Sequence, residues 1–204
     1  MHDVKVERME DFGLWFHTGF THILDPAGID HILYIIVLVI PFAWTNWKSL
    51  VWLITAFTIG HSLTLALSTL GWINMPSSFV EFAIAATISI SCLLNLLSKE
   101  QDTIRLTSRY ALASIFGCIH GLGFSYLLKS MLGSFDRLLA PLFAFNTGLE
   151  AGQLIILIMI LIIKGFIQYF TNISNQKITT TTSFVILILS LYYLMERVKS
   201  LTAA

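Results

Sequence analysis

The chain has 204 residues, of which 56% are hydrophobic and only 12% are charged, and its mean hydropathy is +0.79. A soluble domain carries about 25% charged residues, so these figures exclude an ordinary soluble protein. The 12 basic and 12 acidic side chains cancel, and a neutral chain lacks the basic surface of a nucleic-acid-binding protein. We therefore expect an integral membrane protein with no nucleic-acid partner.

Charged residues are absent from several long apolar stretches. Residues 49–80, 110–128 and 178–195 contain no Asp, Glu, Lys or Arg, and residues 138–163 contain only Glu150. An apolar stretch of about 18 or more residues is a candidate transmembrane helix. The sequence predicts an all-α polytopic bundle that forms a single integral membrane domain over residues 1–204. Its six spans are expected at about 28–44, 48–70, 78–98, 108–132, 138–164 and 180–198.

The N-terminal region is the least regular part of the pattern. Residues 12–24 are apolar, but they are too few to cross a hydrocarbon core of about 30 Å, and Pro26 and Gly28 then interrupt helical hydrogen bonding. We expect a short helix at the membrane interface, with a broken or re-entrant half-helix as the alternative. The opening residues lack the basic-then-apolar order of a signal peptide, so we expect this region to be retained.

The membrane orientation is not fixed by the sequence. Lys and Arg divide equally between the two sides of the predicted bundle, so the positive-inside rule gives a tie. We call the side that holds the N-terminus side A and the opposite side side B. Short loops join the spans, and the Thr-rich stretch 171–182 is expected to be a solvated loop.

Six ionisable residues within the predicted spans are candidates for a functional site, because ionisable groups are costly inside a membrane and usually mark function. At 1.5 Å per residue, Asp30, His31 and Glu81 lie within about 5 Å of side A. By the same rise, His61 lies about 14 Å deep, and His120 and Glu150 lie about 18 Å deep. This placement predicts a polar funnel that opens to side A and closes near the membrane centre. In chain order the six are Asp30, His31, His61, Glu81, His120 and Glu150.

Some of these residues also have a structural explanation. Ser78 and Glu81 have the spacing of a helix N-terminal capping box. His61 alone could be a buried histidine that is hydrogen-bonded to a neighbouring helix. Gly117 and Gly121 form a small-residue packing face on either side of His120, which explains the glycines but not the imidazole.

Glu150 has the weakest structural explanation, because it is a lone carboxylate near the predicted membrane centre. Asn146, Glu150 and Gln153 follow the i, i+4, i+7 spacing that places them on one face of a helix. A glutamate at this depth either becomes protonated or finds a partner. We therefore expect this face to complete or tune a site.

Histidine and carboxylate groups together favour a metal site. Neutral imidazole and carboxylate suit divalent nickel, cobalt, zinc or iron, whereas Cys92 and Cys118 are too far apart to form the paired thiolates of a copper(I) or iron–sulfur site. We expect His31, His61 and His120 to bind a divalent transition-metal ion. Asp30 is suited to accept the spare ring N–H of a metal-binding histidine.

Five polar motifs occur in a recognisable order. Together they resemble the HupE/UreJ family, small bacterial membrane proteins that are associated with hydrogenase and urease and are regarded as nickel permeases. The resemblance extends from about Gly19 to Gln153. The motifs are GFTHILDPAGIDHILYIIVL, FTIGHSLTLAL, PSSFVEFAIAATI, FGCIHGLGF and FNTGLEAGQL.

The resemblance implies a metal-handling protein of the bacterial inner membrane, with nickel as the first expectation and cobalt, zinc and iron as alternatives. The separation between His22 and Asp30 is longer here than is usual in the family. By position, the implied metal-handling residues are His22, Asp30, His31, His61 and His120, with Glu81, Asn146 and Glu150 as supporting or alternative ligands.

We therefore expect a protein that binds a divalent metal ion and moves it across the membrane, rather than an enzyme. Its expected partners are the metal ion and the lipid bilayer, and a homo-oligomer is left open. One alternative is an intramembrane metal-dependent hydrolase, in which water occupies an open coordination position. The other is an electron-transfer protein in which His61 and His120 are the axial ligands of a haem.

Overall fold

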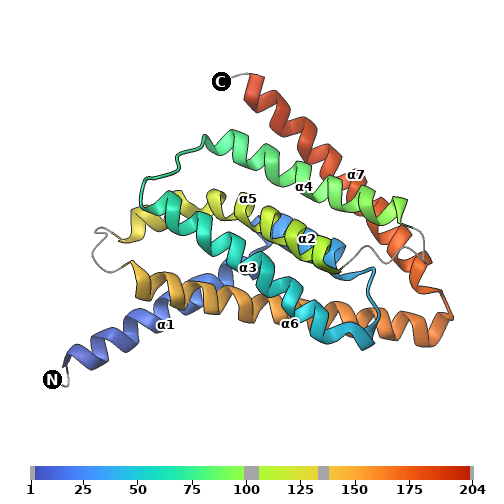
Figure 1. Cartoon of the computed structure of the whole chain (residues 1–204), viewed down its shortest axis with the longest axis horizontal. Coiled ribbons are helices and arrows are strands. Elements are labelled where there is room, and N and C mark those ends of the chain that lie inside the picture. Colours follow the sequence, from blue (N-terminus) through green and yellow to red (C-terminus); the bar gives the residue numbers. More distant parts are fainter. Residues whose placement is uncertain (1–2, 99–105, 133–137, 203–204) are drawn as a thin grey trace.

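The computed structural model describes residues 3–98, 106–132 and 138–202. These residues contain helices and no strand, which confirms the predicted all-α class (Figure 1). Two short 3-10 turns, η1 (Pro26–Gly28) and η2 (Trp44–Asn46), flank the second helix. The α-helices are α1 (Asp3–Leu24), α2 (Ile29–Val39), α3 (Trp47–Thr69), α4 (Ser77–Leu97), α5 (Leu106–Leu132), α6 (Leu139–Thr171) and α7 (Asn175–Thr202).

Four segments are both long enough and apolar enough to cross a membrane: Trp44–Thr69, Ser77–Leu97, Leu139–Thr171 and Asn175–Lys199. Helix α5 has 27 residues and also has the length to cross, although its glycines and His120 make it less apolar. Successive long helices run in alternate directions along the bundle in Figure 1, as short connections require. The chain is thus a helical membrane bundle.

The first span differs from the expectation. Helix α2 has only 11 residues, about 16 Å of helix, so it cannot cross a membrane alone. Residues Phe12–Leu24 of α1 and Ile29–Val39 of α2 together have the length and composition of one span that is bent by 71° at η1. Residues 28–44 therefore do not form the one continuous helix that was expected. A broken span, the alternative, agrees with this geometry.

Helix α1 belongs to the bundle because it packs against α6. Its Trp15 and Ile23 side chains are buried, which a helix lying on the membrane surface would not achieve. The bend follows from the residues between the half-helices, since Pro26 lacks a backbone N–H and fixes its own φ. The break therefore places the end of α1 and the start of α2 inside the bundle.

Glycines let two helix pairs approach until their backbones touch. A Cβ atom at Gly60 of α3 would overlap the Ser114 carbonyl of α5, and one at Gly117 of α5 would overlap the Phe57 carbonyl of α3. This contact confirms the predicted small-residue face of α5. Gly19 of α1 and Gly148 of α6 form the second close crossing in the same way. In Figure 1, α1 and α6 run in the same direction as each other. Helices α3 and α5 also run together, in the opposite direction to α1 and α6.

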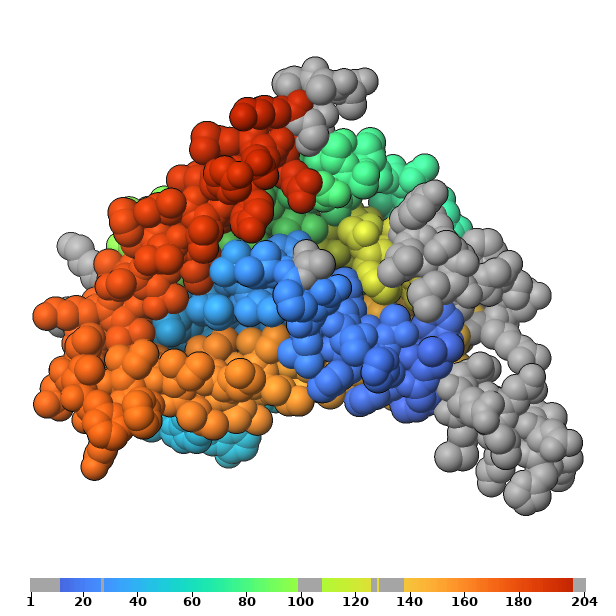
Figure 2. All heavy atoms as spheres, turned by 180° about the vertical axis from the view of Figure 1, so that it is seen from behind, coloured from blue at the N-terminus to red at the C-terminus, as the bar shows by residue number. Residues whose placement is uncertain are grey.

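The C-terminal end of α2 is held by polar side chains from the surrounding helices. Pro41 has no N–H to donate to the Val37 carbonyl, and Asn95 Nδ2 of α4 donates to it instead at 2.8 Å. The buried Lys164 ammonium of α6 donates to the carbonyls of Ile40 and Phe42. Figure 2 shows α2 lying between α6 and α7 on this face of the bundle.

Two helix ends also differ from the sequence prediction. Helix α6 continues past Lys164 to Thr171, because the lysine is buried inside the bundle and does not end the helix. Helix α7 begins at Asn175, so most of the Thr-rich stretch is helical and not a loop. There the Thr179 hydroxyl donates to the Asn175 carbonyl of the preceding turn and to the Ile40 carbonyl of α2.

Candidate metal centre

Histidines from three helices meet at the break in the first span. His22 lies in the last turn of α1, His31 in the first turn of α2 and His61 in the middle of α3. One ligand nitrogen from each can be chosen so that all three lie within 4.8 Å of one another. The ring of His120, on α5, is centred 5.1 Å from the ring of His31. Four of the predicted residues therefore form one group, which we call the histidine cluster.

The local sequence explains why these rings converge. The bend at η1 brings the end of α1 and the start of α2 together, so the rings of His22 and His31 are 4.9 Å apart. His61 directly follows Gly60, where α3 and α5 cross, and His120 lies one turn beyond Gly117, the other half of that crossing. The backbone contact thereby holds two histidines close to the first pair.

A repeated sequence pattern accompanies this arrangement. Gly19-x-x-His22 in α1 and Gly117-x-x-His120 in α5 have the same spacing. In both helices the glycine forms a close crossing, and the histidine follows on the next turn. The shared spacing is a signal in the sequence alone that groups His22 with His120. The family resemblance points to His22 without using this spacing.

The depth expected for His31 is wrong, and the broken span is the reason. Counting a span from residue 28 places Asp30 and His31 near the side A surface. The structure instead packs α1 into the bundle ahead of α2, so these two residues lie at the break between the two half-helices. They are then beside His61 and His120, which the same counting places deeper.

Asp30 positions the imidazole of His31. Its Oδ1 atom accepts a hydrogen bond from the His31 ring Nδ1 at 3.1 Å and another from the His31 backbone N–H at 2.9 Å. A proton held on Nδ1 leaves the lone pair of the neutral ring on Nε2. Asp30 thus acts as a positioning residue rather than as a member of the three-histidine group.

Every histidine of the cluster presents at least one ring nitrogen without a hydrogen-bond partner among the described residues. Buried polar atoms are normally hydrogen-bonded, and exceptions call for an explanation. Several such nitrogens side by side are what a bound cation would satisfy. They are His22 Nε2, His31 Nε2, His61 Nδ1 and Nε2, and His120 Nδ1.

Aromatic side chains surround the cluster. The Phe124 ring is centred 4.2 Å from the His22 ring, and Phe145 stacks against Phe124 at 4.7 Å. The Phe57 ring lies 5.3 Å from His120. Because His61 and His120 are almost completely buried, the cluster is held in an apolar environment, where an ion–ligand interaction is stronger than in water.

The donor set fits a divalent transition-metal ion. Zinc–imidazole bonds are about 2.0–2.1 Å long, so three tetrahedral nitrogen ligands lie roughly 3.4 Å apart. The limit of 4.8 Å between the ligand atoms means that side-chain adjustments of about an ångström suffice to close the site. Imidazole suits nickel, copper, zinc and iron, so this geometry alone does not select one metal.

Two cavities lie beside the α1–α2 break, and one of them reaches the cluster at His22. One, of about 470 Å³, is open and is lined by His22 together with Thr18, Thr21 and Phe124. The other, of about 210 Å³, lies among α2, α4 and α7 and is lined by Asp30, Glu81 and Arg197. Glu81 lies near the start of α4 and Arg197 near the end of α7, which places the second cavity on the side A half.

Glu81 does not have the structural role that its spacing predicts. Helix α4 begins at Ser77 after Pro76, and no side chain caps its N-terminus. Glu81 Oε2 instead pairs with the Arg197 guanidinium at 2.9 Å, and both side chains are nearly half exposed. The capping-box prediction is therefore wrong, and Glu81 lies at the rim of a cavity that also reaches Asp30.

Glu150 and Asn146 lie outside the three-histidine group. Glu150 Oε1 accepts a hydrogen bond from the Thr55 hydroxyl at 2.6 Å, and Thr55 is six residues, or about 9 Å of helix, from His61. Gln153 accepts one from Thr58 in the same way. Asn146 Nδ2 donates to the Leu142 carbonyl of its own helix. The shared face on α6 thus ties α6 to α3 and does not complete the cluster.

A family comparison agrees with this geometry. The family model described as HupE / UreJ protein matches residues 2–197, nearly the whole chain. The chain belongs to the HupE/UreJ family. Comparisons with curated proteins and with solved structures gave no significant match. Membership of this family confirms the resemblance drawn from the five motifs, and the helical bundle agrees with an integral membrane protein.

Proposed function

We propose that this HupE/UreJ protein binds a divalent transition-metal ion at the histidine cluster and carries it across the membrane. Nickel is the first candidate, and cobalt, zinc and iron are the alternatives. The observation that carries the proposal is the meeting of three histidines, from three helices, with their ligand nitrogens within 4.8 Å. The metal ion is the cargo, and the bacterial inner membrane is the proposed location.

Each residue of the site has a defined role in this proposal. His22, His31 and His61 are the ligands, and His120 supplies a fourth nitrogen beside them. Asp30 orients His31 and adds a negative charge that favours a cation. Since protonated imidazole cannot bind a metal, a lower pH on the releasing side would promote unloading.

The position of the cluster favours transport over catalysis. Discontinuous helices with a binding site at their break are typical of secondary transporters, and the α1–α2 break provides such a site. One cavity opens beside His22, and the other lies on the side A half beside Asp30, the partner of His31. A metal-dependent hydrolase or a haem protein would use some of the same imidazoles, but neither explains why the site lies at a broken span.

The test is metal uptake by the purified protein in proteoliposomes, measured with radioactive nickel and repeated with cobalt. We expect His31→Ala and His61→Ala to lower the initial rate at least 10-fold, the scale of losing even an outer-shell partner of a metal site. His17→Ala is the matched control, because His17 is exposed on α1 and lies outside the cluster. Equal uptake by His31→Ala and the parent protein would overturn the proposal.

A further inference from the structure

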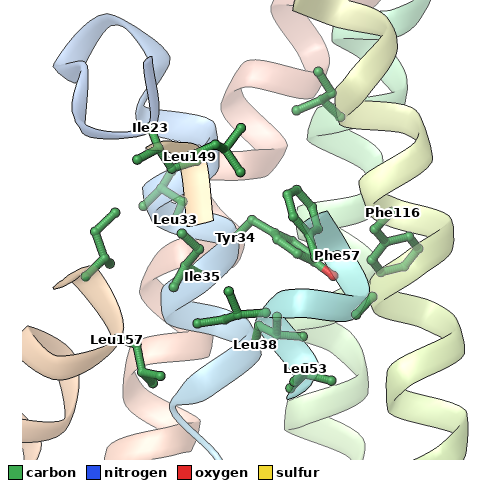
Figure 3. Close-up of a cluster of buried hydrophobic side chains, with 14 of the residues drawn as sticks. Ile23, Leu33, Tyr34, Ile35, Leu38, Leu53, Phe57, Phe116, Leu149 and Leu157 are labelled. Carbon is green, nitrogen blue, oxygen red and sulfur yellow. The ribbon is translucent and has the colours of Figure 1, made fainter. Parts of the chain in front are cut away.

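An aromatic layer closes the histidine cluster on the side away from Asp30. Tyr34 of α2 is one turn beyond His31, and its ring is centred 5.3 Å from His120 and 5.1 Å from Phe57. Phe116 of α5 packs against the same tyrosine at 5.8 Å. Figure 3 shows Tyr34 projecting from α2 toward Phe57 and Phe116. Tyr34 is only 1% exposed, so its side chain is almost completely covered by its neighbours.

A small cavity lies directly beyond this layer. Its volume is about 40 Å³, enough for one or two water molecules. It is lined by the side B ends of α2 and α4 and by the side B start of α5, so it continues from the cluster toward side B. The lining residues that matter for the argument are Tyr34, Leu38, Ser91, Asn95, Arg109 and Leu112.

Within the described part of the chain, the hydroxyl group of Tyr34 is unpaired although this cavity lies beside it. Its oxygen is buried and has no hydrogen-bond partner among the described residues, although the ring lines a cavity that also holds Ser91 and Asn95. A buried hydroxyl without a partner is unfavourable. This cost is removed when the tyrosine side chain turns to a polar neighbour or when water enters the cavity and binds the hydroxyl.

The backbone beneath Tyr34 is anchored. Asn95 holds the Val37 carbonyl, and Lys164 holds the Ile40 and Phe42 carbonyls. These bonds fix the C-terminal half of α2 against α4 and α6. A change at this point is therefore more easily made by rotation of the tyrosine side chain than by movement of the helix.

The alternative route toward side B, between α3 and α6, is less suitable. The Thr55 hydroxyl already donates to Glu150, and the Thr58 hydroxyl already donates to Gln153. Those bonds join the two helices, and opening a path there would break both of them. Rotation of Tyr34 breaks no hydrogen bond that the structure contains among the described residues.

We propose that Tyr34 is the gate between the histidine cluster and side B. The 40 Å³ cavity is then the first site on the exit pathway of the divalent cation. This inference rests on the proposed function. Rotation of the phenol away from His120 joins the cluster to this cavity, where water can meet the leaving ion. Arg109 lines the outer end of this cavity, 5.0 Å from the Phe42 ring. Its positive charge repels a cation, so the cavity releases the ion rather than retaining it.

The first experiment does not depend on metal transport. Leu112→Cys places a thiol in the cavity, in a background with Cys92→Ser and Cys118→Ser, and silver ion, a membrane-impermeant thiol reagent of ionic size, is added from side A. With Tyr34 present we expect almost no labelling. Tyr34→Ala should raise the labelling rate at least 10-fold, because the reagent then passes the cluster. Equal rates with and without the tyrosine would overturn the gate.

The second experiment uses cobalt flux down a gradient in proteoliposomes. We expect Tyr34→Ala to raise passive flux at least 10-fold while cobalt affinity stays within about threefold of the parent. Leu38→Ala is the matched control, since it enlarges the same cavity but leaves Tyr34 in front of His120. Tyr34→Phe keeps the layer closed and should slow uptake several-fold without changing affinity. Normal uptake by Tyr34→Phe together with unchanged flux through Tyr34→Ala would refute the proposal.

The two failures can be told apart. If the parent protein moves no metal but Tyr34→Ala still opens the cavity to the thiol reagent, the proposed function fails and the gate remains. If the parent moves metal and Tyr34→Ala changes neither labelling nor flux, the gate fails and the proposed function remains. Should Tyr34→Ala not fold, the same labelling comparison is made with Tyr34→Ser, for which the same increase is expected.

Discussion

Adding one methyl group at the α3–α5 crossing should weaken metal binding without touching a ligand. A Cβ atom at Gly117 would overlap the Phe57 carbonyl and press on the backbone nitrogen of His61. Restoring an ordinary contact requires the two helices to separate by about 1 Å, whereas metal–ligand distances tolerate only about 0.2 Å. We expect Gly117→Ala to lower metal affinity at least 10-fold, with an overpacking cost of about 1–3 kcal/mol in stability.

Gly123→Ala is the matched control on the same helix. Its Cβ would lie 3.5 Å from Ile84 Cδ1 and 3.7 Å from Val80 Cγ1, which are ordinary van der Waals contacts. Isothermal titration with cobalt in detergent gives the affinity, and circular dichroism confirms that both variants keep their helical content. Parent-like affinity in Gly117→Ala would show that the crossing does not set the geometry of the cluster, and the reasoning from backbone contact to site would be refuted.

Three further predictions follow from the site. Asp30→Asn should weaken cobalt binding about 10-fold, because it removes the charge that orients His31, and unchanged affinity in a titration would show that Asp30 has no positioning role. Lowering the pH should weaken cobalt binding, since only neutral imidazole is a ligand; a pH-independent titration would argue against histidine ligands. Glu150→Gln should leave affinity within about twofold, because a glutamine oxygen can still accept from Thr55, and a large loss would place Glu150 in the site after all.

The interior helices could be predicted well from the sequence, because uncharged apolar length is a direct requirement of the bilayer. The predicted spans 48–70 and 78–98 differ by one residue at each end from α3 and α4. Lys164 is misleading, since a charged residue at the end of an apolar stretch is typical of a membrane boundary, and here it satisfies buried carbonyls within the bundle. Only the tertiary structure provides those carbonyls, so local composition could not reveal them.

The histidines could be recognised individually, but their meeting point could not be located. Their depths depend on where the first span begins, and a count from residue 28 leaves out α1, which packs into the bundle and forms a bent pair with α2. A Pro–Gly break is equally typical of the end of an interfacial helix and of the bend in a broken span. The difference is decided by the packing of Gly19 against α6, which is a long-range contact.

Tyr34 had no signal in the sequence, because an aromatic residue in an apolar helix is ordinary. Its role emerges from the unpaired hydroxyl and the cavity beside it. Glu150, in contrast, had a strong signal as a lone carboxylate, and the Thr55 hydroxyl explains it by a hydrogen bond between helices. Both cases depend on partners that lie far away in the chain.

The most direct test of the central claim is a cobalt titration of the purified protein, followed by the visible absorption of the bound ion. We predict one cobalt ion per chain with the absorption of a low-coordinate, nitrogen-ligated site, and loss of that signal in His22→Ala, His31→Ala and His61→Ala but not in His17→Ala. An absence of bound cobalt, or an unchanged spectrum in all three cluster variants, would contradict the account.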